Sequence, residues 1–152
     1  MLKVRNAFIE DIPLIRELTF KVWPQNYAAL LSPEQISYML EMMYSESSLL
    51  QQMKKGSQFI IVYDDKGPNG FAAYFKITPF VYKLDKIYIL PSQQGKGTGR
   101  FVIDYILDEI KSKGATALRL QVKRDNKARY FYEKLGFNII EEIDFDIGNG
   151  FF

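Results

Sequence analysis

The sequence predicts a single α/β domain with a mixed, mostly antiparallel sheet and helices on both of its faces. Three strand-like runs follow one another closely between residues 58 and 90, which predicts an antiparallel meander. A Gly-rich loop, a helix-like run and a further strand-like run come next, over residues 94–122. Because a strand reached through a crossover helix runs parallel to the strand before it, one parallel pair should join the antiparallel strands.

The chain opens with a predicted strand and helix. Leu2–Phe8 is predicted as the first strand, and Asp11 is predicted to cap a helix that runs to about Val22. Pro13 falls in the first turn of this helix, where a missing N–H loses no partner. The dipeptide Trp23-Pro24 should end the helix, because proline removes a donor from a helix interior.

The segment Ser32-Pro33-Glu34-Gln35 predicts the start of a second helix. It combines an N-cap serine, a proline at the first helical position and a capping-box glutamine. The apolar residues that follow at helical spacing are Ile36, Met39, Leu40 and Met43. A short third helix is predicted over Leu49–Met53, before Gly56. These two helices should lead directly into the meander.

The meander comprises Gln58–Tyr63, Gly70–Ile77 and Phe80–Leu90, joined by turns at Asp64–Asn69 and Thr78-Pro79. After the Gly-rich loop, an apolar face predicts a helix from Phe101 that stops near Lys113-Gly114. The remaining predicted elements are a strand at Thr116–Val122, a helix capped by Asp125-Asn126 that ends at Leu135-Gly136, and a strand at Phe137–Asp146.

Composition restricts the chemistry. The 152 residues suffice for one domain with a sizeable core. Cysteine and histidine are both absent, which excludes thiolate nucleophiles, Ser-His-Asp systems and the commonest metal ligands. Acid–base chemistry must therefore use carboxylates, tyrosines, lysines or water. No apolar run is long enough for a membrane span, and no signal-peptide core follows Met1, so we expect a cytoplasmic protein that does not bind membranes.

The charge is unevenly distributed along the chain. The formal net charge of +2 argues against a general nucleic-acid binder. Residues 83–134, however, carry twelve Lys and Arg against six Asp and Glu, a net charge of +6. Residues 22–53 carry three Glu and no Lys or Arg. The basic segment contains the Gly-rich loop and favours an anionic ligand there.

The loop itself is Gln94-Gly95-Lys96-Gly97-Thr98-Gly99-Arg100, set between a strand and a helix. Its glycines allow backbone N–H groups to approach a phosphate, and the helix directs its positive dipole end to the same point. A Walker A loop is excluded, because Leu90 stands where its first glycine is required and Gly97 follows the lysine. A Rossmann fingerprint fits poorly, since Arg100 replaces its third glycine. The alternative is a Gly-rich turn without a ligand.

On the last predicted helix, Tyr132 shares the apolar face with Ala128, Phe131 and Leu135. Two interpretations follow from this position. Tyr132 is either a core tyrosine with one hydrogen-bond partner or a proton donor directed into a cleft.

The run Leu84–Pro91 with the Gly-rich loop behind it, and the segment Asn126–Phe137 around Tyr132, together resemble the GCN5-related N-acetyltransferase superfamily. The first is Leu84-Asp85-Lys86-Ile87-Tyr88-Ile89-Leu90-Pro91 with the Gly-rich loop behind it, which is similar to the family's Gln/Arg-x-x-Gly-x-Gly/Ala coenzyme A motif after its fourth strand. The second runs from Asn126 to Phe137 and is similar to the family's Asn-x-x-Ala-x-x-Phe-Tyr-x-x-x-Gly-Phe helix. The order of the predicted elements extends the resemblance to nearly the whole chain. Within the family, the region around Ser32 most resembles small bacterial proteins related to polyamine N-acetyltransferases.

The resemblance implies a site for acetyl-coenzyme A and no metal. The residues that it assigns to the pyrophosphate are Gln94, Gly95, Lys96, Gly97, Thr98, Gly99 and Arg100. It implies that the backbone of Ile87 and Ile89 pairs with the pantetheine arm as an added strand, where the fourth and fifth strands splay apart, and that a backbone N–H near Ile87 stabilises the oxyanion. Asn126 would order the same arm, although it could equally serve only as an N-cap.

For the transfer step, the resemblance implies Tyr132 as the general acid and Asp85 as the base, acting through water. At the position of Asp85, the family more often has glutamate. Asp85 could instead be only a surface partner of Lys83 or Lys86.

Acceptor recognition is expected from residues 22–53, where three glutamates are interleaved with aromatic and methionine side chains. Carboxylates and aromatic faces suit a cationic, partly apolar amine. The alternative is an amphipathic helix pair whose apolar residues are core and whose glutamates are solvated. Those apolar residues are Trp23, Tyr27, Tyr38, Met39, Met42, Met43 and Tyr44.

The expected protein is an acyltransferase that moves an acetyl group directly to a primary amine of a small, polyamine-like cation. The alternatives are a non-catalytic acyl-coenzyme A-binding or sensing domain, and acetylation of a protein or peptide amine. The family's seventh strand has no counterpart in the sequence, which stops after the Asn149-Gly150 turn. Either the sequence is cut short, or something else, such as a second subunit, supplies that edge. An unpaired edge there would favour a homodimer.

Overall fold

The computed structural model describes residues 1–27, 31–122 and 128–138. The predicted strand beyond residue 138, the Asn149-Gly150 turn and the cap residue Asn126 lie outside these ranges. None of the helices within them is long and apolar enough to cross a membrane.

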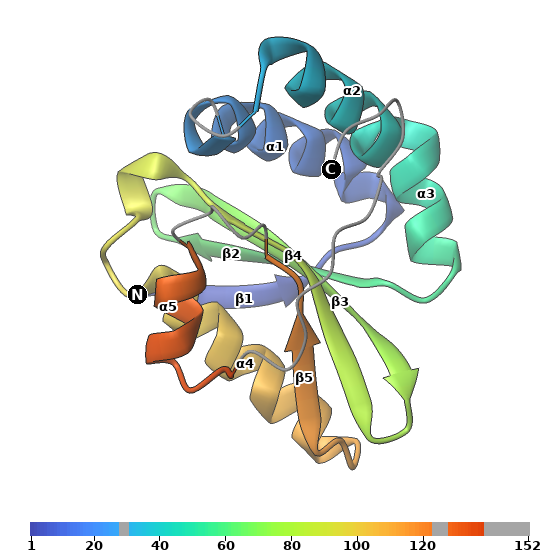
Figure 1. Ribbon diagram of the computed structural model, residues 1–152, viewed down its shortest axis with the longest axis vertical. Coiled ribbons are helices and arrows are strands. Elements are labelled where there is room, and N and C mark those ends of the chain that lie inside the picture. Colours follow the sequence, from blue (N-terminus) through green and yellow to red (C-terminus); the bar gives the residue numbers. More distant parts are fainter. Residues whose placement is uncertain (28–30, 123–127, 139–152) are drawn as a thin grey trace.

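The described strands form one mixed sheet in the order β1-β2-β3-β4-β5 (Figure 1). They are β1 (Lys3–Asn6), β2 (Gln58–Asp64), β3 (Gly67–Thr78), β4 (Val81–Ile89) and β5 (Ala117–Leu120). The first three pairings are antiparallel, and β4 pairs with β5 in parallel. The predicted meander and its parallel partner are therefore confirmed.

The helices lie in two layers that enclose the sheet (Figure 1). They are α1 (Ile12–Tyr27), α2 (Pro33–Tyr44), α3 (Glu46–Lys54), α4 (Thr98–Ser112) and α5 (Ala128–Lys134), with 3-10 turns η1 (Ile9–Asp11) and η2 (Pro91–Gln93). Helices α1 to α3 cover one face of the sheet, and α4 with α5 covers the other. Alternate residues of β2 enter the two cores, Phe59 and Ile61 on one side and Ile60 and Val62 on the other. A strand buried on both faces explains its continuous apolar run.

The start of α2 is the predicted capping box. The Gln35 N–H donates to Ser32 Oγ at 3.1 Å, and the Ser32 N–H donates to Gln35 Oε1 at 2.9 Å. The predicted end of the first helix is wrong, since α1 continues past Pro24 to Tyr27. Proline removes one helical hydrogen bond but does not forbid a helix.

Asp11 stabilises the turn before α1, whereas the sequence predicted it as the cap of the helix itself. It stands at the end of η1, and its Oδ2 accepts a hydrogen bond from the Phe8 N–H at 2.9 Å. Its two carboxylate oxygens also accept from Arg5 Nη1 and Nη2 at 3.0 and 2.9 Å. This hydrogen bonding by Arg5 holds the pKa of Asp11 below its usual value. Asp11 thus ties β1 to the turn that begins α1.

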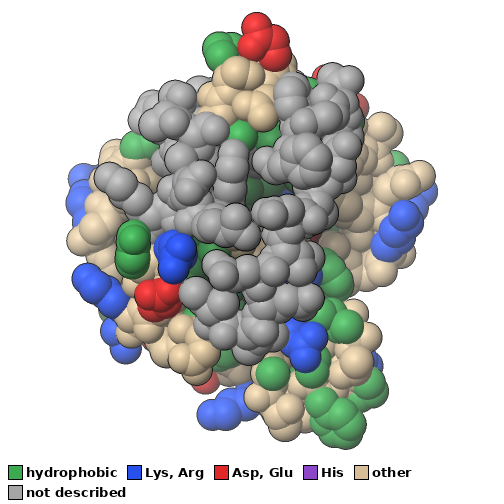
Figure 2. Space-filling view, viewed as in Figure 1, with side chains coloured by type: hydrophobic (Ala, Val, Ile, Leu, Met, Phe, Trp, Pro, Cys, Tyr) green, Lys and Arg blue, Asp and Glu red, His purple; other side chains and the backbone are tan. Residues whose placement is uncertain are grey.

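The hairpin of β3 and β4 extends past the end of β2, whose pairing with β3 begins at Gln58 and Tyr74. Its tip carries two exposed apolar side chains, Ile77 and Phe80. Figure 2 shows hydrophobic side chains gathered at the lower right of the molecule, where this hairpin lies. The Gly-rich loop follows the opposite end of β4. The apolar tip and the loop are therefore separate features.

Candidate active site

The Gly-rich loop joins η2 to α4 and adopts a conformation that requires glycine. Gly95 and Gly97 both have a φ of 80°, in the left-handed region that L side chains rarely enter. Gly97 is the N-cap of α4, and its carbonyl accepts a hydrogen bond from the Phe101 N–H at 3.0 Å. The N–H groups of the first helical turn have no partner within a helix, so this turn presents donors to a ligand.

Helix α4 begins at Thr98, three residues before the predicted start at Phe101. Thr98, Gly99 and Arg100 form the first turn of α4, whereas the sequence predicted them as part of the preceding loop. Thr98 is buried, with 2% of its surface exposed, so its side chain belongs to the packing below the loop. Its N–H belongs to the same first turn.

The charged side chains of the loop lie on its exposed surface. Arg100 Nε is 3.9 Å from Asp104 Oδ2, and both side chains are more than half exposed, so this pair constrains Arg100 little. Lys96 is exposed as well. Both cations can therefore move toward an anionic ligand.

Strand β4 separates from β5 halfway along its length. Their parallel register runs from Val81 opposite Ala117 to Leu84 opposite Leu120, while β4 continues to Ile89. Among the described residues, no strand pairs with this side of β4 beyond Leu84. The sheet is therefore open where β4 approaches the Gly-rich loop, as the resemblance implied.

The backbone of Ile87 and Ile89 faces this opening. The Leu90 N–H donates to the Asn69 carbonyl on β3 at 2.8 Å. Since successive residues of a strand direct their polar groups to opposite edges, the N–H and C=O of Ile89 and Ile87 point away from β3. Gln94 Nε2 donates to the Ile89 carbonyl at 3.1 Å, which ties the loop to the end of the strand.

Asp85 is the extra residue of a β-bulge. The adjacent residues Ala73 and Tyr74 of β3 face Lys86 and Leu84, so Asp85 has no direct partner in the register. It lies directly after the last residue of β4 that pairs with β5. Its Oδ2 is 2.9 Å from Lys86 Nζ, and 27% of its side chain is exposed. The structure thus contains the ion pair with Lys86 that the sequence left as an alternative.

Tyr132 packs inward from α5, on the side of the sheet covered by α4. It packs against the same apolar cluster as Ile87 and Ile89. Its ring meets those of Phe131 and Phe137 edge to face, at centroid distances of 5.3 and 5.9 Å. The predicted inward position is confirmed. Asn126 lies outside the described residues.

Helix α5 rests on the first turn of α4 through Phe131. A Cβ built on Gly99 would stand 3.0 Å from Phe131 Cζ, so the Phe131 ring would have to shift by a few tenths of an ångström to admit it. The structure therefore brings together the loop, the open end of β4 and the helix that carries Tyr132. Neither the contact between Gly99 and Phe131 nor the burial of Lys86 was predicted from the sequence.

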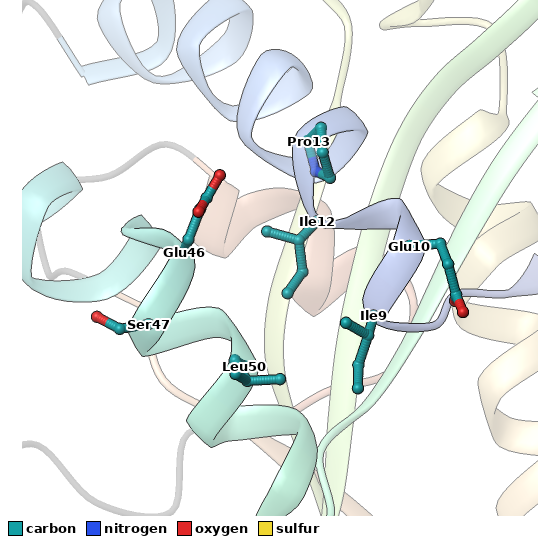
Figure 3. A pocket seen from close by; sticks show the side chains of 7 residues that line it. All are labelled: Ile9, Glu10, Ile12, Pro13, Glu46, Ser47 and Leu50. Atoms are coloured by element: carbon teal, nitrogen blue, oxygen red, sulfur yellow. The ribbon is translucent and has the colours of Figure 1, made fainter.

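The predicted acceptor segment divides between core and surface. Tyr44 is buried and Met39 and Met43 pack against the same core, which favours the structural interpretation for these three. The side chains of Trp23 and Tyr27 lie outside the description. Glu46 is exposed and lines a cavity of about 520 Å³ between η1 and α3 (Figure 3). None of the predicted catalytic or cofactor-binding residues lines this cavity.

Comparison with known proteins decides the family. Residues 16–137 match the Acetyltransferase (GNAT) family, which is most of the chain. The chain belongs to this family. It is therefore an acyltransferase of the N-acetyltransferase type that uses acetyl-coenzyme A.

Two curated relatives illustrate the range of the family. A spermidine N(1)-acetyltransferase from Thermoplasma acidophilum is 27% identical over 91% of this chain and 89% of its own length. A ribosomal protein bS18-alanine N-acetyltransferase from Haemophilus influenzae is 41% identical, but over only 58 residues, which are 38% of this chain and 40% of the relative. The chain thus matches less than half of the second relative's length.

Among solved structures, the PaiA N-acetyltransferase from Thermoplasma acidophilum in complex with coenzyme A superimposes with a TM-score of 0.84 and 26% identity. The alignment covers 95% of this chain and 93% of that one. The residues present here fit such a cofactor, because two left-handed glycines precede a helix of 15 residues beside an open strand edge. Within the described ranges, no three acidic, His or Cys side chains gather as a metal site would require.

Proposed function

We propose that this GNAT protein transfers the acetyl group of acetyl-coenzyme A directly to a primary amine of a small, polyamine-like cation. One observation carries the proposal above the others. Strand β4 leaves β5 after Leu84, so the N–H and C=O of Ile87 and the N–H of Ile89 face an opening that ends at the Gly-rich loop, where Gln94 already donates to the Ile89 carbonyl. An extended arm can pair with such an edge as an added strand while its phosphates reach the loop.

In this proposal, the backbone N–H groups from Gln94 to Arg100 bind the pyrophosphate, with Lys96 and Arg100 adding charge. Ile87 and Ile89 hold the pantetheine arm by backbone hydrogen bonds, and Asn126 orders it from the start of the last helix. These contacts position the cofactor before the amine arrives. Positioning of this kind lowers the entropic part of the barrier.

Bound acetyl-coenzyme A supplies the thioester carbonyl that the amine attacks. The Ile87 N–H stabilises the negative charge that develops on the carbonyl oxygen. Asp85 accepts one proton from the acceptor ammonium through a water molecule before the amine attacks. The Tyr132 hydroxyl donates a proton to the sulfur as the C–S bond breaks, and the second proton that the nitrogen loses returns to the Tyr132 oxygen. The absence of histidine supports the assignment of these tasks to a carboxylate and a tyrosine.

The choice of a small cation is supported by two observations. The spermidine acetyltransferase aligns with nearly the full length of both chains, whereas the bS18-alanine acetyltransferase aligns with 38% of this one. Residues 22–53 contain three glutamates and no cation. Carboxylates near the acceptor entrance would attract a polycation.

A second candidate acceptor is the amine of a protein or peptide, favoured by the 41% identity to the bS18-alanine acetyltransferase. A kinetic comparison separates the two. The purified chain is incubated with acetyl-coenzyme A and either polyamines, monoamines, amino acids or peptides, and release of free thiol is followed. We expect the highest kcat/KM for polyamines. A peptide that is acetylated more efficiently than every small amine would favour the second candidate, and coenzyme binding without transfer to any amine would favour a sensing domain.

A further inference from the structure

Lys86 is a buried cation at the edge of the proposed reaction site. Only 7% of its side chain is exposed, although it stands on the strand that carries Asp85. It faces Ala73 in the register, on the side of the sheet covered by α1 to α3. A charge this deeply buried requires a specific partner, because burial without one is costly.

The partners of Lys86 are a carboxylate and an aromatic ring. Its Nζ is 2.9 Å from Asp85 Oδ2 and 5.0 Å from the centroid of the Tyr44 ring. A ring at this distance attracts a cation through its quadrupole. The ammonium is therefore held from two sides, by β4 and by the end of α2.

The Tyr44 ring is itself fixed. It meets the rings of Phe71 and Tyr88 edge to face at 6.4 and 6.1 Å, and 1% of Tyr44 is exposed. Arg16 Nε also donates to the Tyr44 carbonyl at 3.0 Å. Because this aromatic support cannot shift easily, it fixes the ammonium, and the ammonium in turn fixes the carboxylate.

The Asp85 carboxylate contacts the buried ammonium of Lys86 and is itself partly exposed to solvent. Its Oδ2 lies on Lys86, yet 27% of the side chain is exposed at the point where β4 leaves β5. A bulge residue has one ladder contact fewer than its neighbours to fix its orientation. Its orientation therefore depends on Lys86.

We propose that Lys86 is a positioning residue that binds Asp85 Oδ2 and thereby leaves Asp85 Oδ1 for the water molecule that takes the proton of the acceptor ammonium. The inference rests on the proposed function, in which Asp85 serves the acceptor through this water. Two cations then share one carboxylate, Lys86 directly from inside and the substrate through water from outside. Acceptors that carry a positive charge at neutral pH depend on this arrangement, whereas an aromatic amine that is already neutral does not.

The kinetic test compares Lys86→Met with Lys86→Arg, using a polyamine and a neutral aromatic amine as acceptors. We expect Lys86→Met to lower kcat/KM for the polyamine at least tenfold, with less than a threefold change for the aromatic amine and an unchanged KM for acetyl-coenzyme A. Lys86→Arg should restore part of the loss. In an Asp85→Asn background, Lys86→Met should add no further loss, because the group that it positions is already altered.

Equal losses for both acceptors, or additive losses in the double variant, would show that Lys86 only supports the fold and would overturn the inference.

A binding test is independent of catalysis. Lys86→Ala removes the ammonium and opens space beside Asp85 and Tyr44, so n-propylammonium at millimolar concentration should raise its Tm. The same amine should leave wild type unchanged, and n-propanol should have no effect on Lys86→Ala. If no amine is acetylated by wild type, the proposed function fails, and the propylammonium result still decides whether this site recognises an ammonium. Absence of that stabilisation contradicts the positioning role.

Discussion

Phe131 lies against Gly99, so the helix that carries Tyr132 is seated directly on the first turn of the helix behind the Gly-rich loop. A Cβ on Gly99 would stand 3.0 Å from Phe131 Cζ. The Phe131 ring therefore occupies space that a side chain at position 99 would need, which places the proposed phosphate cradle in contact with the helix of the proposed proton donor. This contact links cofactor binding to the transfer step.

Replacing Gly99 with valine should separate the two helices. Overpacking of this kind costs about 1–3 kcal/mol, and a displacement of about 1 Å at a catalytic group can cost roughly a hundredfold in rate. We expect kcat to fall at least tenfold, measured by thiol release at saturating acetyl-coenzyme A. The double variant Gly99→Val, Phe131→Ala should recover part of the activity. If the second change worsens the defect instead, the helix contact is not the cause.

Gly97→Ala should weaken cofactor binding through the backbone alone. Gly97 has a φ of 80° and an added Cβ would meet no atom within 4 Å, so the penalty is conformational, about 1–2 kcal/mol. Relaxation of the loop would misdirect an N–H group, and one such bond to a charged phosphate is worth about 1.5–3 kcal/mol. Calorimetric titration with coenzyme A should show a Kd raised about tenfold or more.

The matched control is Gly56→Ala. Gly56 follows α3 and has a φ of 106°, and a Cβ added there would likewise meet no atom within 4 Å. It should lower the Tm by a similar amount and leave the Kd for coenzyme A unchanged. Equal effects of both variants on the Kd would remove the special role of the loop.

Tyr132→Phe keeps the ring packing with Phe131 and Phe137 and removes only the hydroxyl. A general acid contributes about 10²- to 10⁴-fold, so kcat should fall by at least the lower figure while the Kd for coenzyme A changes little. Tyr130→Phe on the same helix, with 59% of the residue exposed, serves as the control and should retain full activity. A fully active Tyr132→Phe enzyme would remove Tyr132 from the acid role.

Asp11→Ala should destabilise the chain in a pH-dependent manner. The Asp11 carboxylate accepts from the Phe8 N–H and from Arg5, and its loss should cost about 1 kcal/mol at neutral pH. Because the Arg5 hydrogen bonds lower the pKa of Asp11 in the folded state, this contribution is fully present above the unfolded pKa of about 3.9 and is lost as the pH falls through the lower folded value.

Urea unfolding at pH 7 and at successively lower pH below 4 should therefore show a difference between wild type and Asp11→Ala that shrinks with acid. Glu17→Ala is the control, because the pair of Glu17 with Lys21 is exposed and contributes little. A difference that stays constant with pH would mean that the carboxylate charge does not stabilise the turn.

Local signals predicted most of the fold. The capping box at Ser32, the meander and the inward face of α5 each depend on residues near in sequence. The bulge at Asp85 depends on which residues of β3 face β4, and without it Leu84 and Lys86 would be expected on the same face of the sheet. The continuation of α1 past Pro24 could not be read from the proline, because proline lowers helix stability without fixing the outcome.

In the candidate site, too, the sequence predicted the local features and missed the contacts between distant elements. The Gly-rich loop was found from its glycines, and Tyr132 from helical spacing, because both signals are local. The contact between Gly99 and Phe131 joins residues 32 positions apart, and the Tyr44 ring over Lys86 joins β4 to α2. Such contacts are set by packing between elements, which no local pattern encodes.

The most direct test of the account is mass spectrometry of the acceptor after incubation of the purified chain with acetyl-coenzyme A and spermidine, with thiol release measured in parallel. Transfer to a small cation predicts monoacetylated spermidine, formed in a one-to-one ratio with free coenzyme A and strongly reduced in Tyr132→Phe. Unmodified spermidine and other unmodified small amines, from a protein that binds coenzyme A and retains its fold, would contradict it.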